Sequence, residues 1–420
     1  MKEQAQRNSE EEFGDDGDMT VDSVDSLASF DSKDSSLSLD SFESSASMST
    51  TASYLSQASL GSVVDAMVGE TIRVARYVYK PVVDCDIDFY SPTILIEDLD
   101  ESKCIHDFRF RKPELNEMAN LLWPKLSMFL EGTKEEITCS NRYVCHYETG
   151  LLLCLFRLSR PRRLRPEMEK YFCMRKSKIS AIISTFMDAI NNIAVSYLSD
   201  PTIYRHRFDF YNHLIQRKTN LAGLGVWGFI DGTLRKTCRP SDFQRLAYSG
   251  HKRCHGIKFQ SVVTPDGLIA LLFGPVAGSR HDSFMLDESG LLPMLTQLMP
   301  ADSPIFSLYG DPAYPQSAYL YGGFRAALPG SAEAKWNTRM SKVREVVEWL
   351  FKEIISKWAF LDFKAGMKIF QFPVAQYYTV GAFLTNLHTC SYGSETCSYF
   401  GCAQPDDGRL TMEQYLALVP

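Results

Sequence analysis

The sequence lacks the long apolar runs that mark membrane-spanning segments. No stretch approaches the roughly 18 apolar residues that a helix needs to cross a bilayer. The start of the chain, Met1-Lys-Glu-Gln, also lacks the apolar stretch of a signal peptide. We therefore expect a soluble intracellular protein that is not associated with a membrane.

Closely spaced cysteine pairs are absent too. The chain has 11 cysteines, an odd number, and no two of them form a Cys-x-x-Cys pair. Because structural zinc sites commonly use such pairs, the loose group His388, Cys390, Cys397 and Cys402 does not predict a zinc site. We expect the thiols to be reduced and mostly buried.

Basic residues are scarce in the first 60 positions, which have 13 Asp or Glu against 3 Lys or Arg, and 16 Ser. Such a segment cannot bury enough apolar surface to offset the entropy cost of ordering it. We expect residues 1–61 to form a disordered acidic tail. The tail either only keeps the chain solvated, which we favour, or binds a partner. The remaining residues have 41 Lys or Arg against 38 Asp or Glu, a balance that is compatible with nucleic-acid binding.

Residues 62–215 have a largely helical pattern. Apolar residues recur every three or four positions from Leu115 to Leu130 and from Glu148 to Leu158. Pro124 is expected to kink or split the first of these helices.

A basic segment follows these helices. Between Arg157 and Lys178 there are nine Lys or Arg against two Glu, and an apolar-periodic segment then runs to Ile190. Two helices joined by a short basic break favour a helix-turn-helix-like unit that contacts DNA phosphates. The alternative is a basic, solvated face on an ordinary helical domain.

A strand pattern begins near residue 222. Two apolar runs, 225–231 and 305–311, each end in an aspartate. Between them, strand-like residues 256–263 and 268–273 flank Thr264-Pro-Asp-Gly267. The Pro and Gly positions suit a type I turn, so these residues predict a hairpin.

The elements after the hairpin complete an α/β pattern. A helical segment from Ser283 to Leu298, broken near Gly290, precedes the second apolar run, and a long amphipathic helix follows that run. The order of strand, hairpin, helix, strand and helix predicts a mixed sheet flanked by helices.

Four carboxylates have settings that favour metal chemistry: Asp231, Asp282, Asp311 and Glu348. Acids at two strand ends and one on a later helix can hold two hard divalent cations over a phosphodiester. Each acid has an ordinary alternative, because Asp231 and Asp311 could simply form turns and Asp282 could cap a helix. The combination favours the metal site, since independent strand and helix patterns place acids where a metal pair requires them.

The helix around Glu348 provides an internal test. At 100° per residue, Glu348 lies roughly 110° from the centre of the apolar stripe and Glu345 roughly 170° from it. We therefore expect Glu348 at the border between helix and sheet, and Glu345 in water. The alternative is an ion pair of Glu348 with Arg344 or Lys352, four residues away. The stripe consists of Val343, Val346, Val347, Leu350, Phe351, Ile354, Ile355 and Trp358.

Six motifs follow one another along the chain: Phe229-Ile-Asp-Gly-Thr, Tyr248-Ser-Gly-His-Lys-Arg, Gly256-Ile-Lys-Phe-Gln, Gly278-Ser-Arg-His-Asp-Ser, Tyr309-Gly-Asp-Pro-Ala-Tyr and Arg344-Glu-Val-Val-Glu-Trp-Leu-Phe. In this order they resemble the motifs of Harbinger-type DDE transposases and their nuclease relatives. The resemblance covers about residues 225–392, and the basic segment near residue 160 is similar to that family's helix-turn-helix region. The family's Phe-Gly after the glutamate is Phe351-Lys352 here.

This resemblance implies an RNase H-like sheet with Asp231, Asp311 and Glu348 as catalytic and metal-binding residues. Asp282 takes a fourth metal-binding position. We expect a helix-turn-helix-like helical domain over residues 62–215, the RNase H-like nuclease domain over 216–392, and a C-terminal tail over 393–420 that packs on or follows it.

The expected function is a divalent-metal-dependent DNA endonuclease or transposase that uses Mg²⁺ or Mn²⁺. Expected partners are DNA and, from the family, a separate Myb-like DNA-binding protein, with homo-oligomers left open; the expected compartment is the nucleus. Alternatives are a domesticated DNA-binding or regulatory protein without cleavage, and a phosphoesterase of another class. Seven cations between the first strand and the hairpin are candidates for holding the DNA backbone: Arg235, Lys236, Arg239, Arg245, Lys252, Arg253 and Lys258.

Overall fold

The structure is a computed structural model that describes residues 93–161, 166–223, 225–299 and 305–420. Clustering of the chain gives two compact units, Met1–Gln57 and Ala58–Pro420, and every described residue belongs to the second. The predicted acidic tail at residues 1–61 lies outside the described residues.

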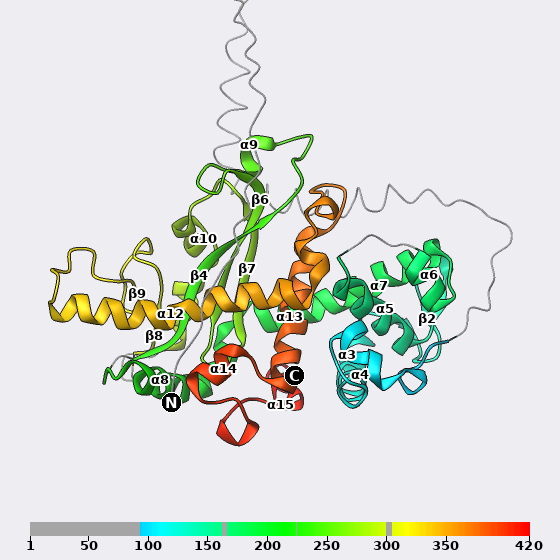
Figure 1. Ribbon diagram of the computed structural model, residues 1–420, viewed down its shortest axis with the longest axis horizontal. Helices are drawn as coiled ribbons and strands as arrows, with labels where there is room; N and C mark the ends of the chain where they lie inside the picture. Colours follow the sequence, from blue (N-terminus) through cyan, green and yellow to red (C-terminus); the bar gives the residue numbers. More distant parts are fainter. Residues whose placement is uncertain (1–92, 162–165, 224, 300–304) are drawn as a thin grey trace, which may run out of the picture. The chain divides into compact units, whose positions relative to one another are not determined.

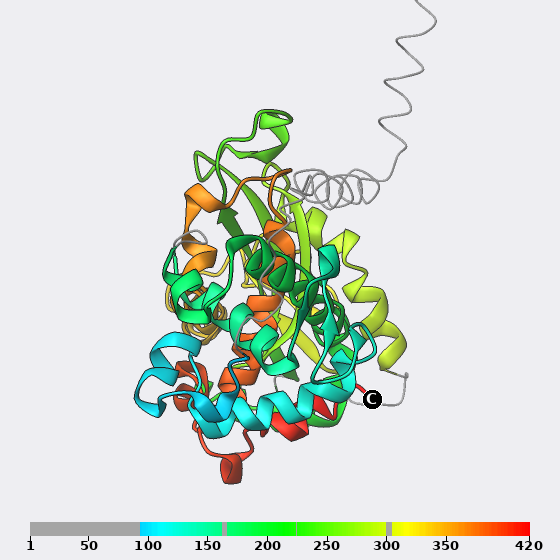
Figure 2. The same cartoon turned by 90° about the vertical axis from the view of Figure 1, so that its right-hand side faces the viewer.

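The described chain begins with helices, most of which gather on one side of the sheet, whereas the last of them, at residues 208–219, packs against the sheet itself (Figures 1 and 2). The predicted helix at 115–130 is α4, which continues through Pro124 and ends at Leu126. The predicted helix at 148–158 is confirmed as α5. The helices are α3 (Glu101–Phe108), α4 (Lys112–Leu126), α5 (Tyr147–Ser159), α6 (Pro166–Phe172), α7 (Lys176–Leu198) and α8 (Phe208–Thr219). A small sheet of β1 (Glu131–Gly132), β2 (Ile137–Thr138) and β3 (Val144–Cys145) separates α4 from α5.

The helix α7 is the central helix of this region. Thirteen of its residues are buried, and it packs against α5 and α13. By length and composition alone, α7 is also the one described helix that could cross a membrane. Its contacts are those of a core helix. A short break at residues 173–175 separates α6 from α7, and residues 162–165 of the basic segment lie outside the described residues. The helix-turn-helix-like unit stays a prediction.

A six-stranded mixed sheet follows, as predicted. Its main strands run in the order β7-β6-β4-β8-β9, and the short β5 pairs with β6. The strand β4 is antiparallel to β6 and parallel to β8, and β6 is antiparallel to β7. The strands are β4 (Val226–Lys236), β5 (Tyr248–Ser249), β6 (Cys254–Val263), β7 (Ile269–Ala277), β8 (Ser307–Tyr309) and β9 (Leu320–Tyr321).

The predicted hairpin is confirmed by β6 and β7. The amide of Gly267 donates to the carbonyl of Thr264, and Gly267 adopts φ +74°, a conformation that glycine tolerates best. The turn residue Asp266 is buried, and its carboxylate accepts hydrogen bonds from Arg207 and Tyr211.

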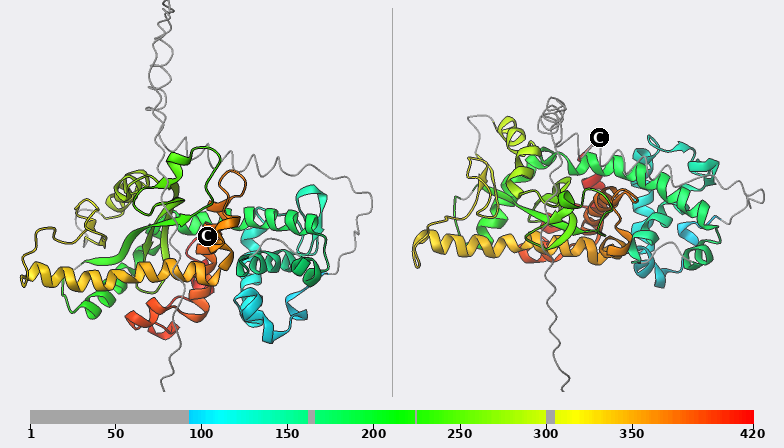
Figure 3. Two further views of the ribbon diagram at one scale, coloured as in Figure 1. Left: turned by 45° about the horizontal axis from the view of Figure 1, so that its top comes forward. Right: turned by 90° about the horizontal axis from the view of Figure 1, so that it is seen from above.

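Helices cover both faces of the sheet (Figure 3). The long helix α12 crosses one face, while α10 and α11 lie on the other. The predicted break near Gly290 is confirmed, because this residue separates α10 from α11. The helices after β4 are α9 (Gln244–Ala247), α10 (Asp282–Glu288), α11 (Leu291–Leu298), α12 (Ala332–Lys357), α13 (Val374–Tyr392), α14 (Glu395–Phe400) and α15 (Met412–Leu416).

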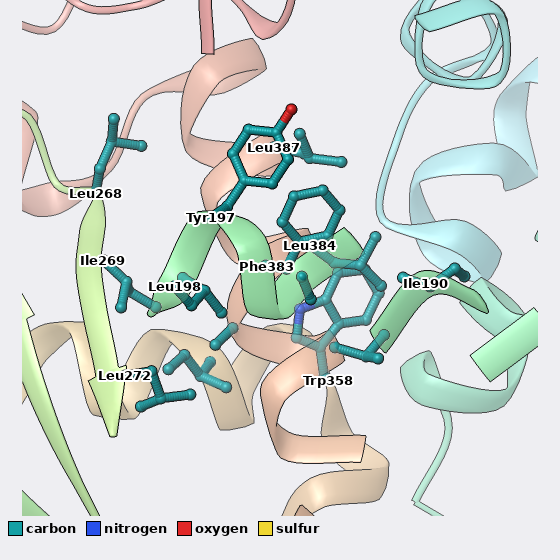
Figure 4. Close-up of a cluster of buried hydrophobic side chains, with 14 of the residues drawn as sticks. Ile190, Tyr197, Leu198, Leu268, Ile269, Leu272, Trp358, Phe383, Leu384 and Leu387 are labelled. Carbon is teal, nitrogen blue, oxygen red and sulfur yellow. The ribbon is translucent and has the colours of Figure 1, made fainter. Parts of the chain in front are cut away.

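The core joins the helical region to the sheet where α7, α13 and β7 meet. Tyr197 on α7 and Phe383 on α13 have ring centroids 5.4 Å apart, and both helices also pack against β7, which carries Ile269 (Figure 4). The amide of Asn386 donates to the carbonyl of Ile269 and accepts from its backbone N–H. The predicted boundary at residue 215 falls inside α8, which packs against β4.

The predicted strand ends need correction. Asp231 does not end its strand, because β4 continues to Lys236 and pairs with β6 along this extension. The strand β8 is shorter than the predicted run and ends at Tyr309, two residues before Asp311. The long-range pairing of β4 with β6 decides where β4 ends.

A histidine lies in the contact between α13 and the helical region. The ring of His388 lies 5.4 Å from that of Phe110 and 4.7 Å from that of Tyr392, and its Nδ1 has no hydrogen-bond partner. Burial, followed by the positive charges of Lys357 and Arg109, lowers the pKa of His388 to about 3.

We expect acid to destabilise the fold through His388. Its pKa rises from about 3 in the folded state to 6.5 in the unfolded state, so the penalty is absent above pH 6.5 and grows as the pH falls toward 3. The loss is about 2 kcal/mol between pH 7.5 and 5. His388→Phe should lose that much less stability over this range in urea unfolding. Equal losses in both proteins would contradict the assignment.

Candidate active site

The candidate site lies where β4 leaves the pairing with β8. The described pairing of these strands stops at Phe229 and Tyr309, whereas β4 continues to Lys236 along β6. From Ile230 onward, β4 therefore has one edge without a described strand partner. Asp231 and Asp311 each come two residues after the last pair, so the two chain segments bring both acids to this edge.

Asp231 is held by the helix that crosses its face of the sheet. Its Oδ2 accepts a hydrogen bond of 2.5 Å from the Arg344 guanidinium on α12, and its Oδ1 accepts one from the amide of Gly232. The two ion-paired side chains are less than a fifth exposed. Burial raises the pKa of the Asp231 carboxyl, and the nearby charge of Asp282 raises it further, against the lowering effect of Arg344.

Asp282 approaches from the other face. It is the first residue of α10. Its Oδ1 forms a 3.0 Å ion pair with Nζ of Lys258 on β6. A Cβ at Gly232 would lie 2.9 Å from that Oδ1, so only glycine at position 232 leaves room for this carboxylate. The helix-cap alternative is not observed, because His281 is the N-cap and makes no side-chain cap bond.

Asp311 turns the chain after β8. Its Oδ1 accepts from the amide of Ala313, and its carbonyl accepts from the amide of Tyr314. The predicted turn-forming alternative therefore describes its local role.

Tyr314 links the Asp311 turn to Asp282 through a buried side chain. It is 1% exposed, and its hydroxyl accepts a 3.0 Å hydrogen bond from Nε2 of the buried Gln260, which also donates to the backbone carbonyl of Asp282. Burial raises the pKa of the Tyr314 hydroxyl, and the negative charges of Asp282, Asp231 and Asp311 each raise it further.

Glu348 is exposed and lies one helical turn beyond Arg344 on α12. Its predicted position at the border of helix and sheet is taken by Arg344, which reaches Asp231. Arg344 therefore forms its ion pair with Asp231 and not the alternative one with Glu348. The predicted apolar stripe is confirmed from Val343 to Trp358, and Glu345 is exposed as expected.

The described side chains fit a hard divalent cation in kind. Carboxylate oxygens are the ligands that Mg²⁺ and Mn²⁺ prefer. The buried Oγ of Ser261, the register partner of Asp231, has no hydrogen-bond partner, which leaves a polar atom free beside the carboxylate.

These carboxylates are not yet arranged as a ligand set. No three His, Cys, Asp or Glu side chains among the described residues lie together in a way that could hold a metal. Asp231 and Asp282 are instead each paired with a basic side chain. A cation that binds here has to replace Arg344 and Lys258 on these carboxylates.

The predicted DNA-holding cations divide into two groups. Lys258 pairs with Asp282, and Arg235 donates to Thr233 with its guanidinium 5.3 Å from the ring of Tyr378. The other five are exposed on the end of β4 and the segment between β4 and β6: Lys236, Arg239, Arg245, Lys252 and Arg253.

Sequence patterns did not identify Arg344 or Tyr314 as site residues. Arg344 has a detectable signal in its spacing, four residues before Glu348, which places both on one side of the helix. Tyr314 follows Asp311 by three residues, and the Asp311 turn brings the ring back onto the sheet. The Tyr314 ring packs close to Gly310, where Ile230 also approaches, and no local sequence pattern reveals this packing.

The four acids lie inside the one segment for which a comparison with known proteins found a match. Residues 230–386 match the family model described as DDE superfamily endonuclease. No curated protein and no solved structure matched the chain. The match covers less than half of the chain, and it starts on β4 and ends on α13. Residues 230–386 are therefore the segment in which this chain is similar to the DDE superfamily endonucleases.

Proposed function

We propose that this protein is a divalent-metal-dependent DNA endonuclease or transposase. The observation that carries the proposal is that β4 and the segment after β8 bring Asp231 and Asp311 to the open edge of β4, where Asp282 lies against Gly232. The endonuclease family match to the same segment gives independent support.

The proposed fold of this segment is RNase H-like, and the proposed subtype is Harbinger-type. The strand order β7-β6-β4-β8-β9, with β8 and β9 parallel to β4, supports an RNase H-like sheet. The subtype rests on the sequence motifs, which include both Tyr309-Gly-Asp-Pro-Ala-Tyr and Arg344-Glu-Val-Val-Glu.

In the proposed mechanism, Asp231, Asp311 and Glu348 would hold the divalent cations at the reacting phosphodiester, and Asp282 would support them from the opposite face. Bound Mg²⁺ or Mn²⁺ would supply the charge that activates a water or a DNA 3′ hydroxyl and stabilises the leaving oxygen. Within the chain, the hydrogen bond from the Ala313 amide fixes the direction of the Asp311 carboxylate. Glu348 reaches the site after Arg344 releases Asp231.

DNA is the proposed substrate and partner. Exposed cations between β4 and β6, together with the basic segment before α7, would neutralise backbone phosphates. We further propose the nucleus as the compartment, and we propose a separate Myb-like DNA-binding protein and a second copy of this chain as candidate partners.

We expect the aspartates to be essential for cleavage. Asp231→Asn and Asp311→Asn should each lower Mg²⁺-dependent nicking of supercoiled plasmid by at least about a hundredfold, since metal charge stabilisation is worth several kcal/mol. The matched control is Asp287→Asn, an exposed acid on α10 outside the site. Nicking that persists in a folded Asp231→Asn or Asp311→Asn protein would remove the assigned site.

Glu348 and Glu345 form a second matched pair, because both are exposed and lie three residues apart on α12. Glu348→Gln should abolish nicking to the same extent as the aspartate variants, and Glu345→Gln should leave it within about twofold of the unmodified protein. Circular dichroism and melting temperature establish that both variants fold. Equal nicking by the two variants would show that α12 contributes no acid to the site.

Arg344 is expected to compete with metal for Asp231. Arg344→Gln should bind Mn²⁺ about tenfold more tightly in calorimetry, because a hydrogen bond to a charged group is worth roughly 1.5–3 kcal/mol. The control is Arg339→Gln, which removes a cation from the exposed surface of the same helix. Weaker Mn²⁺ binding by Arg344→Gln would instead mean that this residue positions Asp231 for the metal.

A second candidate function is a transposase-derived DNA-binding or regulatory protein that does not cleave. The pairing of Asp231 with Arg344 and of Asp282 with Lys258 favours it, because both carboxylates are satisfied without a metal. The plasmid assay separates the two functions. DNA binding without nicking at any Mg²⁺ or Mn²⁺ concentration would establish this second candidate.

A further inference from the structure

A cavity of about 970 Å³ opens beside Asp311, outside the group of acids. Its volume is at the upper end of the range of roughly 300–1,000 Å³ found for small-molecule sites. Gln316 and Arg325 supply polar groups to its lining. Three aromatic side chains also line it: Tyr321, Phe324 and Trp336.

The aromatic wall is firmly built. The Trp336 ring on α12 meets the ring of Phe324 edge-on at 5.3 Å, and it meets the buried Tyr309 ring in the same manner. Asn337 fixes the backbone of Phe324 through two hydrogen bonds of 2.9 Å, one donated and one accepted. Phe324 nevertheless remains 52% exposed and Tyr321 38% exposed, so their rings are accessible to a ligand.

Close packing ties this wall to the candidate active site. The Arg325 guanidinium donates two hydrogen bonds, of 3.0 and 2.7 Å, to the carbonyl of Pro312, the neighbour of Asp311. A Cβ at Gly322 would lie 3.1 Å from the carbonyl oxygen of Asp311. The cavity and the Asp311 carboxylate are therefore on one packed segment, and their separation is set by these backbone contacts.

We propose that this cavity binds an unpaired nucleobase of a DNA strand that passes the acidic site. The inference rests on the proposed function, because it takes DNA as the substrate. Aromatic rings stack on any base, which makes an exposed aromatic wall a typical platform for single-stranded nucleic acid. A guanidinium and an amide at the rim match the polar edge of a base and its phosphate, which a purely apolar ligand would leave unused.

The position of the cavity gives the base a role in the reaction. A base that is held against Phe324 and Trp336 is no longer stacked in the duplex. It would be the neighbour of the phosphate that faces Asp311. Duplex DNA must be unpaired or frayed there before a base can enter. The site would therefore prefer DNA with an unpaired end or mismatch over fully paired DNA.

The test measures binding without metal, so that cleavage plays no part. Fluorescein-labelled duplexes with a 3′ single-stranded overhang are titrated with the full chain in EDTA and followed by anisotropy. A matched series carries one abasic residue at each of the first four unpaired positions. Loss of the base at one position should weaken binding about tenfold, because stacking of one base contributes on this scale.

Two variants place the effect in the cavity. In Phe324→Ala the abasic penalty should shrink to under about twofold, as expected when a stacking platform is removed. Leu328→Ala removes an apolar side chain that is 74% exposed and outside the cavity lining, and it should keep the full penalty. An equal affinity for base-containing and abasic DNA in the unmodified chain overturns the proposal, as does a penalty that persists in Phe324→Ala.

The result is independent of cleavage. A tenfold abasic penalty that requires Phe324, in a protein that does not nick plasmid, would support the base site and reject the nuclease function. Nicking without any abasic penalty would do the opposite. A chain that binds neither overhang nor blunt duplex overturns both.

Discussion

The ion pair of Arg344 with Asp231 is the interaction on which the site depends, because it fixes α12 against the middle of β4. Both side chains are less than a fifth exposed, so neither charge is well solvated by water. Removing one partner of such a pair leaves a buried charge at a cost of about 3–5 kcal/mol. Asp282, which raises the pKa of Asp231 further, adds to that cost. A positive charge at this point is therefore a requirement of the fold, and the chain supplies it with Arg344.

The need for positive charge beside these carboxylates connects the folding of the chain to the proposed chemistry. Asp282 has its own cation in Lys258, and its charge raises the pKa of Asp231. Because negative charges that lie close together repel one another, each of the two basic side chains stabilises the folded state. Two basic side chains meet this need without a metal, and divalent ions would meet it during cleavage. An exchange between the two states changes which groups bind the carboxylates but leaves the sheet unchanged.

Local patterns predicted the elements that local forces determine. The hairpin around Thr264-Pro-Asp-Gly267 follows from turn geometry, and the buried stripe of α12 follows from helical periodicity. The end of β4 was not predictable in this way, because its last residues are strand only through pairing with β6. The stripe gave the angle of Glu348 around its helix but not how α12 lies over the sheet. That placement brings Arg344, and not Glu348, onto Asp231, and it depends on contacts between residues more than 100 positions apart.

The helical region and the sheet share one core, so the function of one cannot be separated physically from the other. The helices α7 and α13 pack against each other, and both contact β7. Arg109, at the end of α3, donates to the carbonyls of Lys357 and Ser159, which joins the last residue of α12 to α5. A displacement of the helices at the basic segment would thus be passed to α12, the helix that carries Arg344 and Glu348. In a protein that binds DNA through one region and cuts it with the other, this shared packing is a direct physical route by which binding affects the acids.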